Sequence, residues 1–244
     1  MLVFLYINIV WFLAGFINGV TSFGGNMFAV PLMTLVMDPK DAIILGCIGG
    51  LGITTSITVF YHRNLPKLEF ILACVSSIVG VPFGMILLEI APAKAVLIGC
   101  GCILLLFLAW QAVAGRMHLT FAIPMWTIVP VGILSGILLS STSMGGPILA
   151  MYAVMRGWGK EVTLSVLSTM GMISMIFLVA LQWKNGLYTP EILHNAMWAV
   201  PCTVIGVLIS IPILRRIDPR LFRLLVLGML AVSAGMLFMR GWQA

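Results

Sequence analysis

Two short segments of the chain combine paired glycines with small polar residues. The first reads Thr21-Ser22-Phe23-Gly24-Gly25-Asn26, and the second reads Ser141-Thr142-Ser143-Met144-Gly145-Gly146-Pro147. Paired glycines tolerate unusual backbone angles and let a ligand approach the main chain, so they permit a helix to break and restart. A restarting helix presents N–H groups and the positive end of its dipole, which suit an anion. The two segments therefore predict an anion-binding site.

We expect backbone amides near residues 24–26 and 145–147 to hold the anion, with nearby hydroxyl and amide groups as further donors. A second polar group in the following spans adds Thr54 and Thr169, which lie on the faces also marked by Thr58 and Ser165. The predicted substrate-binding residues are Asn18, Thr21, Ser22, Gly24, Gly25, Asn26, Thr54, Ser141, Thr142, Ser143, Gly145, Gly146, Pro147 and Thr169. The alternative is that these small residues only allow close helix packing. Two copies of the pattern, each beside a short apolar run, favour a site.

Other kinds of chemistry lack the residues they need. All seven acidic residues fall at span ends or in loops, where they do not form the intramembrane carboxylate sites of proton relays and cation carriers. The CxC of Cys100 and Cys102 has no His or acidic neighbour, so no metal site is predicted. The chain offers neither a nucleophile–base pair nor a Walker-type loop, which argues against an enzyme and an ATP-driven pump. No cofactor is expected, and the scattered basic residues do not favour nucleic-acid binding.

Composition predicts the elements that carry these segments. Of 244 residues, 61% are hydrophobic and 8% charged, and the mean hydropathy is +1.17. Soluble domains are about 45–50% apolar and about 25% charged, so the chain is predicted to be an all-α polytopic membrane protein. Eight apolar runs are long enough to cross a bilayer. They cover 2–22, 41–60, 69–89, 95–113, 122–140, 161–182, 192–213 and 221–239. Two shorter runs, 26–37 and 147–156, follow the glycine pairs and indicate re-entrant or broken helices.

The order of runs predicts an internal repeat. Gly50 and Gly171 share the offset of 121 residues that separates the glycine pairs, and Pro82 corresponds to Pro201 with a two-residue slip. Residues 1–113 form the predicted first repeat, 114–121 a cytoplasmic connection and 122–244 the second repeat, all within one membrane domain. Each repeat has one broken or re-entrant hairpin and three full spans. A hairpin that returns to its own side adds no net crossing, so each repeat crosses the membrane three times. Because three is odd, the second repeat is inverted relative to the first, as in many secondary transporters.

Basic residues predict the orientation. With each hairpin returning to the side it entered, nine Lys and Arg residues collect on one side and four on the other. The positive-inside rule then places the nine in the cytoplasm and both termini outside. Since the cell interior is negative, an exported anion gains about 2.3 kcal/mol per 100 mV, which favours export without an internal carboxylate.

The two motifs and the compact two-repeat length resemble the sulfite exporter TauE/SafE family of membrane transporters, also called toluenesulfonate-uptake-type permeases. The Gly145-Gly146-Pro147 copy is the most specific element, whereas the first copy ends in Asn26 and departs from the Gly- and Pro-rich form. The resemblance implies a prokaryotic inner-membrane carrier of small sulfur-containing anions, such as sulfite or organosulfonates. An anion channel of the same architecture, a carrier for a small carboxylate and a membrane scaffold stay open as alternatives. The expected partners are the small anion and the lipid bilayer, and association with a second copy of the chain as a homodimer stays open.

Overall fold

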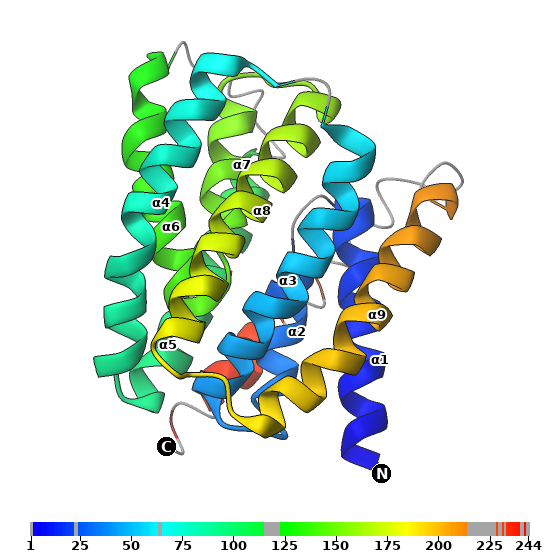
Figure 1. Cartoon of the computed structure of the whole chain (residues 1–244). Helices are drawn as coiled ribbons and strands as arrows, with labels where there is room; N and C mark the ends of the chain where they lie inside the picture. The colour runs from blue at the N-terminus through cyan, green and yellow to red at the C-terminus, as the bar shows by residue number, and fades with distance from the viewer. Residues whose placement is uncertain are drawn as a thin grey trace.

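The computed structural model describes residues 2–21, 24–62, 65–114 and 123–213, together with 228, 231, 233–239 and 242. The described chain is helical, in the order shown in Figure 1. The helices are α1 (Leu2–Thr21), α2 (Gly25–Met33), α3 (Pro39–Tyr61), α4 (Lys67–Ile90), α5 (Ala93–Ala114), the 3₁₀ turn η1 (Met125–Thr127), α6 (Ile128–Thr142), α7 (Gly146–Met155), α8 (Lys160–Lys184) and α9 (Pro190–Ile213).

Local sequence explains where several helices begin and end. Asp38 caps α3 by accepting a hydrogen bond from the Lys40 N–H at 2.9 Å, and Pro39 occupies the first turn, where its missing N–H costs nothing. Gly157 and Gly186 follow α7 and α8 with φ of 67°, a left-handed conformation that glycine adopts without steric cost.

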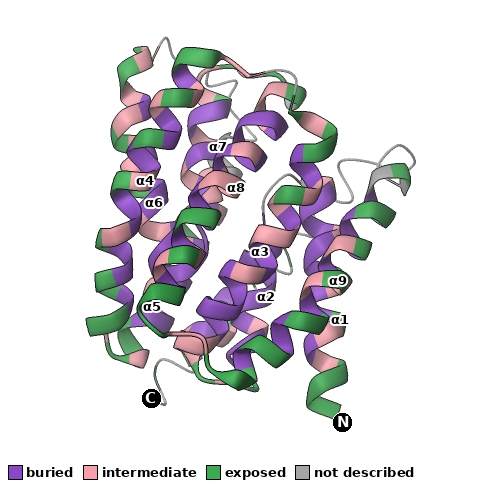
Figure 2. Cartoon of the chain, viewed as in Figure 1, coloured by how far each residue is buried: buried purple, intermediate pink, exposed green. Residues whose placement is uncertain are grey.

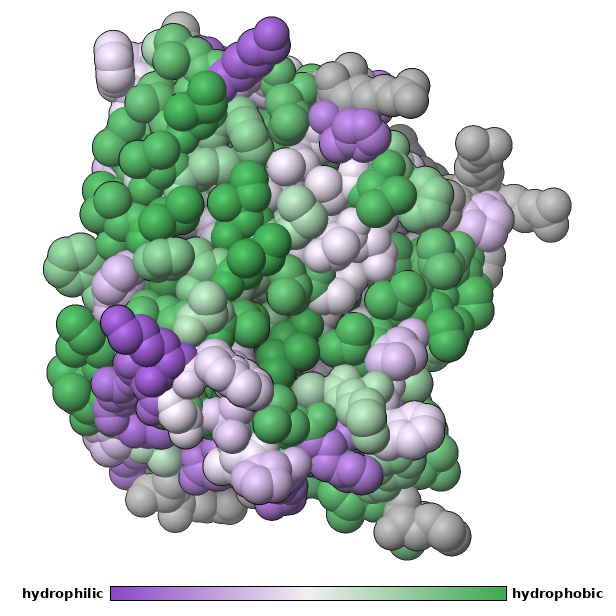
Figure 3. Space-filling model, in the orientation of Figure 1, coloured by the Kyte–Doolittle hydropathy of each residue, from purple (hydrophilic) through white to green (hydrophobic). Residues whose placement is uncertain are grey.

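Seven described helices are long and apolar enough to cross a membrane, which confirms the prediction of a polytopic membrane protein. Each of the first seven predicted spans, from 2–22 to 192–213, corresponds to a helix. Most of the eighth, 221–239, lies outside the described residues. Helix faces that point outward are exposed and those that point inward are buried (Figure 2). The outer surface carries broad hydrophobic areas, with hydrophilic residues gathered toward its two ends (Figure 3). This distribution matches a surface that faces lipid between two aqueous phases.

The two short helices form hairpins that return to the side they entered. Tyr6, near the start of α1, donates a hydrogen bond to the carbonyl of Leu32, near the end of α2, at 3.1 Å. At the end of α7, Arg156 donates to the carbonyl of Ile123, which precedes α6, at 3.0 Å, and forms an ion pair with the buried carboxylate of Glu69 on α4. The chain therefore reverses direction at each glycine pair.

Contacts at the helix ends separate two sides of the bundle. On one side, the Lys40 ammonium donates to the Glu89 carbonyl at 2.8 Å, and the Asn185 amide donates to the Glu89 carboxylate at 3.2 Å. On the other side, the Ser165 hydroxyl donates to the Tyr61 carbonyl. Figure 1 places the α4–α5 and α8–α9 connections at the first end, with the N-terminus, and the α3–α4 and α7–α8 connections at the opposite end.

Helices from the two halves pack together through glycines. A Cβ at Gly80 of α4 would lie 2.1 Å from the Ile133 carbonyl oxygen of α6, and one at Gly206 of α9 would lie 2.1 Å from the Phe12 carbonyl oxygen of α1. Ile133 follows Phe12 by 121 residues, but Gly206 follows Gly80 by 126. These equivalent contacts favour an offset of 126 between α4 and α9, in place of the predicted correspondence of Pro82 with Pro201.

A glycine-to-alanine pair tests these close contacts. A Cβ at Gly136 would lie 2.1 Å from the Ser77 carbonyl oxygen, whereas one at Gly99 of α5 meets no described atom within 4 Å. Alanine favours a helix over glycine by up to about 1 kcal/mol at either position, but overpacking costs about 1–3 kcal/mol. We expect Gly136→Ala to lower the unfolding temperature in detergent and Gly99→Ala to leave it unchanged or raise it. Equal unfolding temperatures for the two variants would contradict the close α4–α6 contact.

Candidate substrate-binding site

Both helix breaks contain a residue in the left-handed backbone region. Gly24 precedes α2 with φ of 106°, and Ser143 follows α6 with φ of 61°. Glycine adopts this region freely, but a serine there is strained by about 1–3 kcal/mol and needs support from its surroundings. The break in the second half is therefore a conformation that other contacts must hold.

Each break is tied to the helix before it. The side-chain Oδ1 atom of Asn18 on α1 accepts a hydrogen bond from the Gly25 N–H at 3.0 Å, and this bond caps the start of α2. In the second half, the Ser135 hydroxyl on α6 donates to the Gly145 carbonyl at 2.8 Å. Two different side chains thus fix the path of the chain between the arms of each hairpin.

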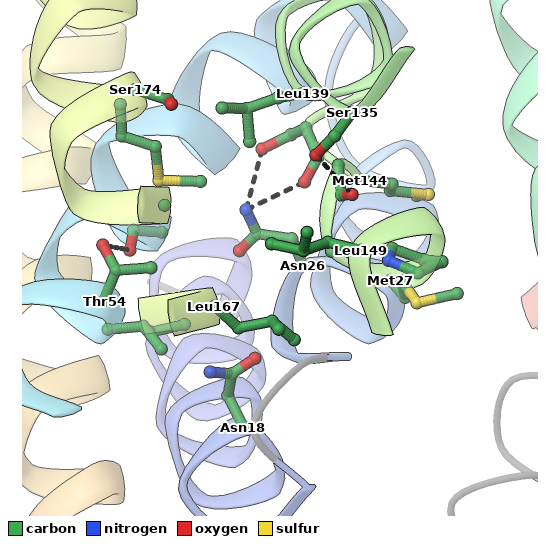
Figure 4. A pocket seen from close by; sticks show the side chains of 18 of the residues that line it. Asn18, Asn26, Met27, Thr54, Ser135, Leu139, Met144, Leu149, Leu167 and Ser174 are labelled. Carbon is green, nitrogen blue, oxygen red and sulfur yellow. Dashed lines mark hydrogen bonds between the residues drawn. The ribbon is translucent and has the colours of Figure 1, made fainter. Parts of the chain in front are cut away.

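The side chain of Asn26 joins the two breaks. Its amide nitrogen lies 3.1 Å from the Ser143 carbonyl oxygen, 2.8 Å from the Ser143 hydroxyl oxygen and 3.1 Å from the Gly46 carbonyl oxygen. Residues 117 positions apart in the sequence are therefore connected in the middle of the bundle. Figure 4 shows the dashed bonds that run from the Asn26 nitrogen to the second half. These bonds supply the support that the left-handed Ser143 needs.

A cavity of about 80 Å³ lies between the two breaks. Sites for drug-sized molecules are typically about 300–1,000 Å³, so this cavity suits a small ion. The structure brings together eight of the predicted binding residues in its lining, namely Asn18, Gly24, Asn26, Thr54, Ser143, Gly145, Gly146 and Pro147. Residues from both halves of the chain, on helices α1, α2, α3, α6, α7 and α8, contribute to the wall.

The described wall of the cavity combines uncharged polar groups with apolar side chains and carries no Asp, Glu, Lys or Arg side chain. The starts of α2 at Gly25 and of α7 at Gly146 lie beside the cavity. Each helix N-terminus carries roughly half a positive charge, and its first-turn N–H groups have no partner within the helix. Two such ends together match about one negative charge.

Six of the predicted binding residues do not line the cavity or do not belong to the described part of the chain. Ser22 is not among the described residues, nor is the side chain of Thr21. Gly25 directs its N–H to Asn18, and Thr169 lies outside the cavity lining with its hydroxyl oxygen buried. The hydroxyls of Ser141 and Thr142 donate to the carbonyls of Ile137 and Leu138 in their own helix, each at 2.7 Å. This geometry favours a structural role for these two hydroxyls.

The lining also contains residues that the sequence did not assign to the site. Gly50, Gly171, Ser174 and Ser135 line the cavity and were not among the predicted binding residues. Gly50 and Gly171 carry a usable signal, since they share the 121-residue offset of the glycine pairs. The remaining wall is apolar and includes the methionines Met27, Met144, Met170 and Met175. Methionine is unbranched and flexible, so it fills irregular space in such a wall readily.

A buried row of neutral groups connects the cavity to the α8–α9 loop. The Cys47 thiol lies 3.8 Å from the Ser143 hydroxyl, and the Gln182 amide nitrogen donates to the Cys47 sulfur at 3.5 Å. In the loop, the Tyr188 hydroxyl donates to the side-chain Oε1 atom of Gln182 at 2.7 Å. Burial raises the pKa of Tyr188, so its phenol stays neutral and remains a donor. These contacts link the Asn26 interaction to one end of the bundle.

The stability of the protein should depend on Asn26. Replacing it by leucine keeps the side-chain size but leaves the carbonyls of Gly46 and Ser143 without this donor, which costs about 1–3 kcal/mol for buried groups. We expect Asn26→Leu to lower the unfolding temperature measured in detergent. Asn195 of α9 is a matched control, because its exposed fraction is also 9% and it lies outside the cavity lining. If Asn195→Leu destabilises the protein as much as Asn26→Leu, the Asn26 hydrogen bonds do not have this importance.

Comparison with known proteins identifies a family for the chain. The family model described as "Sulfite exporter TauE/SafE" matches residues 7–237, which includes both helix breaks and the whole described cavity wall. No curated protein and no solved structure matches the chain.

Proposed function

Because the chain belongs to the sulfite exporter TauE/SafE family of membrane transporters, we propose that it is a secondary carrier of a small sulfur-containing anion. Sulfite is the substrate that the family description names, small organosulfonates are the related candidates that the resemblance implies, and export is the proposed direction. The observation that carries the proposal is the meeting of two helix breaks, one from each half, at a single small cavity. The resemblance noted in the sequence extends over nearly the whole chain, so it applies to both halves of the site.

The anion is held between the starts of α2 and α7 in this proposal. The Gly25 N–H already binds Asn18 and Pro147 has no N–H, so the remaining first-turn amides of the two helices are the donors for the anion. The glycines at 145 and 146 let the anion approach the main chain closely. Helix termini that point into a midplane cavity are the typical anion-binding arrangement of secondary transporters.

Alternating access is the proposed mechanism, with the two halves as inverted repeats that move about the shared cavity. The equivalent contacts of α4 with α6 and of α1 with α9 support this, since each pairs a helix of one half with a helix of the other. Both termini outside and the basic loops in the cytoplasm complete the proposed orientation. An anion leaving a negative interior gains about 2.3 kcal/mol per 100 mV, which is sufficient to drive export without a coupled ion.

Counterflow in proteoliposomes tests this function. Vesicles preloaded with unlabelled sulfite should transiently accumulate external radiolabelled sulfite above equilibrium, because a carrier exchanges substrate across the membrane. Uptake without saturation or counterflow would indicate a channel. Uptake of small carboxylates but not of sulfur oxyanions would indicate the other substrate class, and no uptake would contradict the transport proposal.

Two occluding variants should abolish the counterflow. Gly146→Val places a branched side chain at the start of α7, and Gly171→Leu fills the cavity from α8, where the alanine-sized part of the side chain meets Thr54 at 3.1 Å. Thr142→Val is the control, because it is nearly isosteric and lies outside the lining. We expect at least a tenfold loss of initial rate in the first two and wild-type rates in the control, with all three eluting as folded protein from gel filtration. Normal rates in both occluding variants would refute the site.

A further inference from the structure

The strongest remaining signal in the cavity is an acceptor atom without a donor. Asn26 lines the cavity, and its Oδ1 atom is buried and has no hydrogen-bond partner among the described residues. Buried polar atoms are paired in the great majority of cases, so an unpaired one in a binding cavity points to a ligand. Figure 4 shows this oxygen on the side of the amide away from the dashed bonds, toward the space near Thr54, Leu167 and Asn18.

The orientation of the Asn26 amide is dictated by its neighbours. Oxygen and nitrogen of an amide are exchanged by a simple flip, so their assignment has to follow from hydrogen bonding. The carbonyls of Gly46 and Ser143 are acceptors only, and both lie 3.1 Å from the amide nitrogen. A flipped amide would place oxygen against two carbonyl oxygens. The NH₂ group must therefore face Gly46 and Ser143, and the side-chain carbonyl oxygen points away from them (Figure 4).

We infer that the transported anion is a monoanion that carries a hydrogen-bond donor, as hydrogensulfite and sulfamate do. This rests on the proposed function, since it specifies which sulfur-containing anions occupy that site. A ligand that displaces water from a polar group without replacing its hydrogen bond loses affinity. A fully deprotonated oxyanion has only acceptors and faces the Asn26 oxygen with repulsion.

The charge of the site favours the same class of anion. The described lining has no basic side chain, and the two helix N-termini together offer roughly one positive charge. A monoanion is compensated by that potential, whereas the second charge of a dianion is desolvated without a partner. Asn26 and the helix ends therefore select for the same protonation state through two independent interactions.

A matched pair of ligands tests the inference on the wild-type protein. Sulfamate and methanesulfonate are monoanions at neutral pH with the same number of non-hydrogen atoms, and they differ by an NH₂ group in place of a methyl group. We expect sulfamate to bind about tenfold more tightly by calorimetry of the purified protein, a difference of about 1.4 kcal/mol. Sulfite binding should weaken as pH rises through its second ionisation, while sulfamate binding should not change over the same range.

Variants assign the preference to Asn26. In Asn26→Leu, assayed below its unfolding temperature, the ratio of the two dissociation constants should fall to about one, since leucine removes the acceptor. In Asn195→Leu, which changes a residue outside the lining, the tenfold ratio should persist. Should Asn26→Leu not fold, the ligand pair and the pH series on the wild-type protein still decide the question.

The outcomes separate the two proposals. Equal affinity for sulfamate and methanesulfonate, or sulfite binding that strengthens with rising pH, overturns the requirement for a donor and leaves the carrier of sulfur-containing anions intact. Binding of neither ligand and no counterflow of sulfite overturns the proposed function and this inference with it.

Discussion

The hydrogen bonds from the Asn26 amide to the break in the second half are the interaction on which the centre of this protein depends. They hold Ser143 in a left-handed conformation that serine adopts at a cost, and they fix the start of α2 relative to the end of α6. The Asn26 side chain connects the two breaks, and the cavity lies between them. The same residue lines that cavity, so one side chain both assembles the site and contributes to its wall.

The position of Asn26 also explains a difference between the two copies of the motif. Asn26 and Pro147 are 121 residues apart and occupy the same place in their copies. Proline at that place fits the first turn of α7, and it offers no side-chain hydrogen bond. Asparagine in the first copy supplies the amide that reaches the second. The asymmetry therefore places an amide side chain at the start of α2 and no hydrogen-bonding side chain at the corresponding place in α7.

Much of the architecture follows from the sequence, because a span needs about 20 apolar residues and a break needs glycine. Hydrophobic length therefore predicts the long helices, and the glycine pairs predict the two short ones. The ion pair of Glu69 with Arg156 was not predicted, since it joins residues 87 positions apart that read as separate span ends. The hydroxyls of Ser141 and Thr142 lie elsewhere than expected because a hydroxyl in the last turn of a helix bonds a carbonyl four residues back. The role of the Asn26 amide depends on a partner 117 residues away, which no local pattern contains.

Locating a bound oxyanion directly is the measurement that tests the central claim most closely. Selenite has the shape of sulfite and contains an atom with strong anomalous scattering, so crystals grown with selenite would show the position of the anion. The account predicts one anomalous peak in the cavity, between the starts of α2 and α7 and within hydrogen-bond distance of Asn26. A peak confined to the loops, or to an intramembrane position away from both helix breaks, would contradict it.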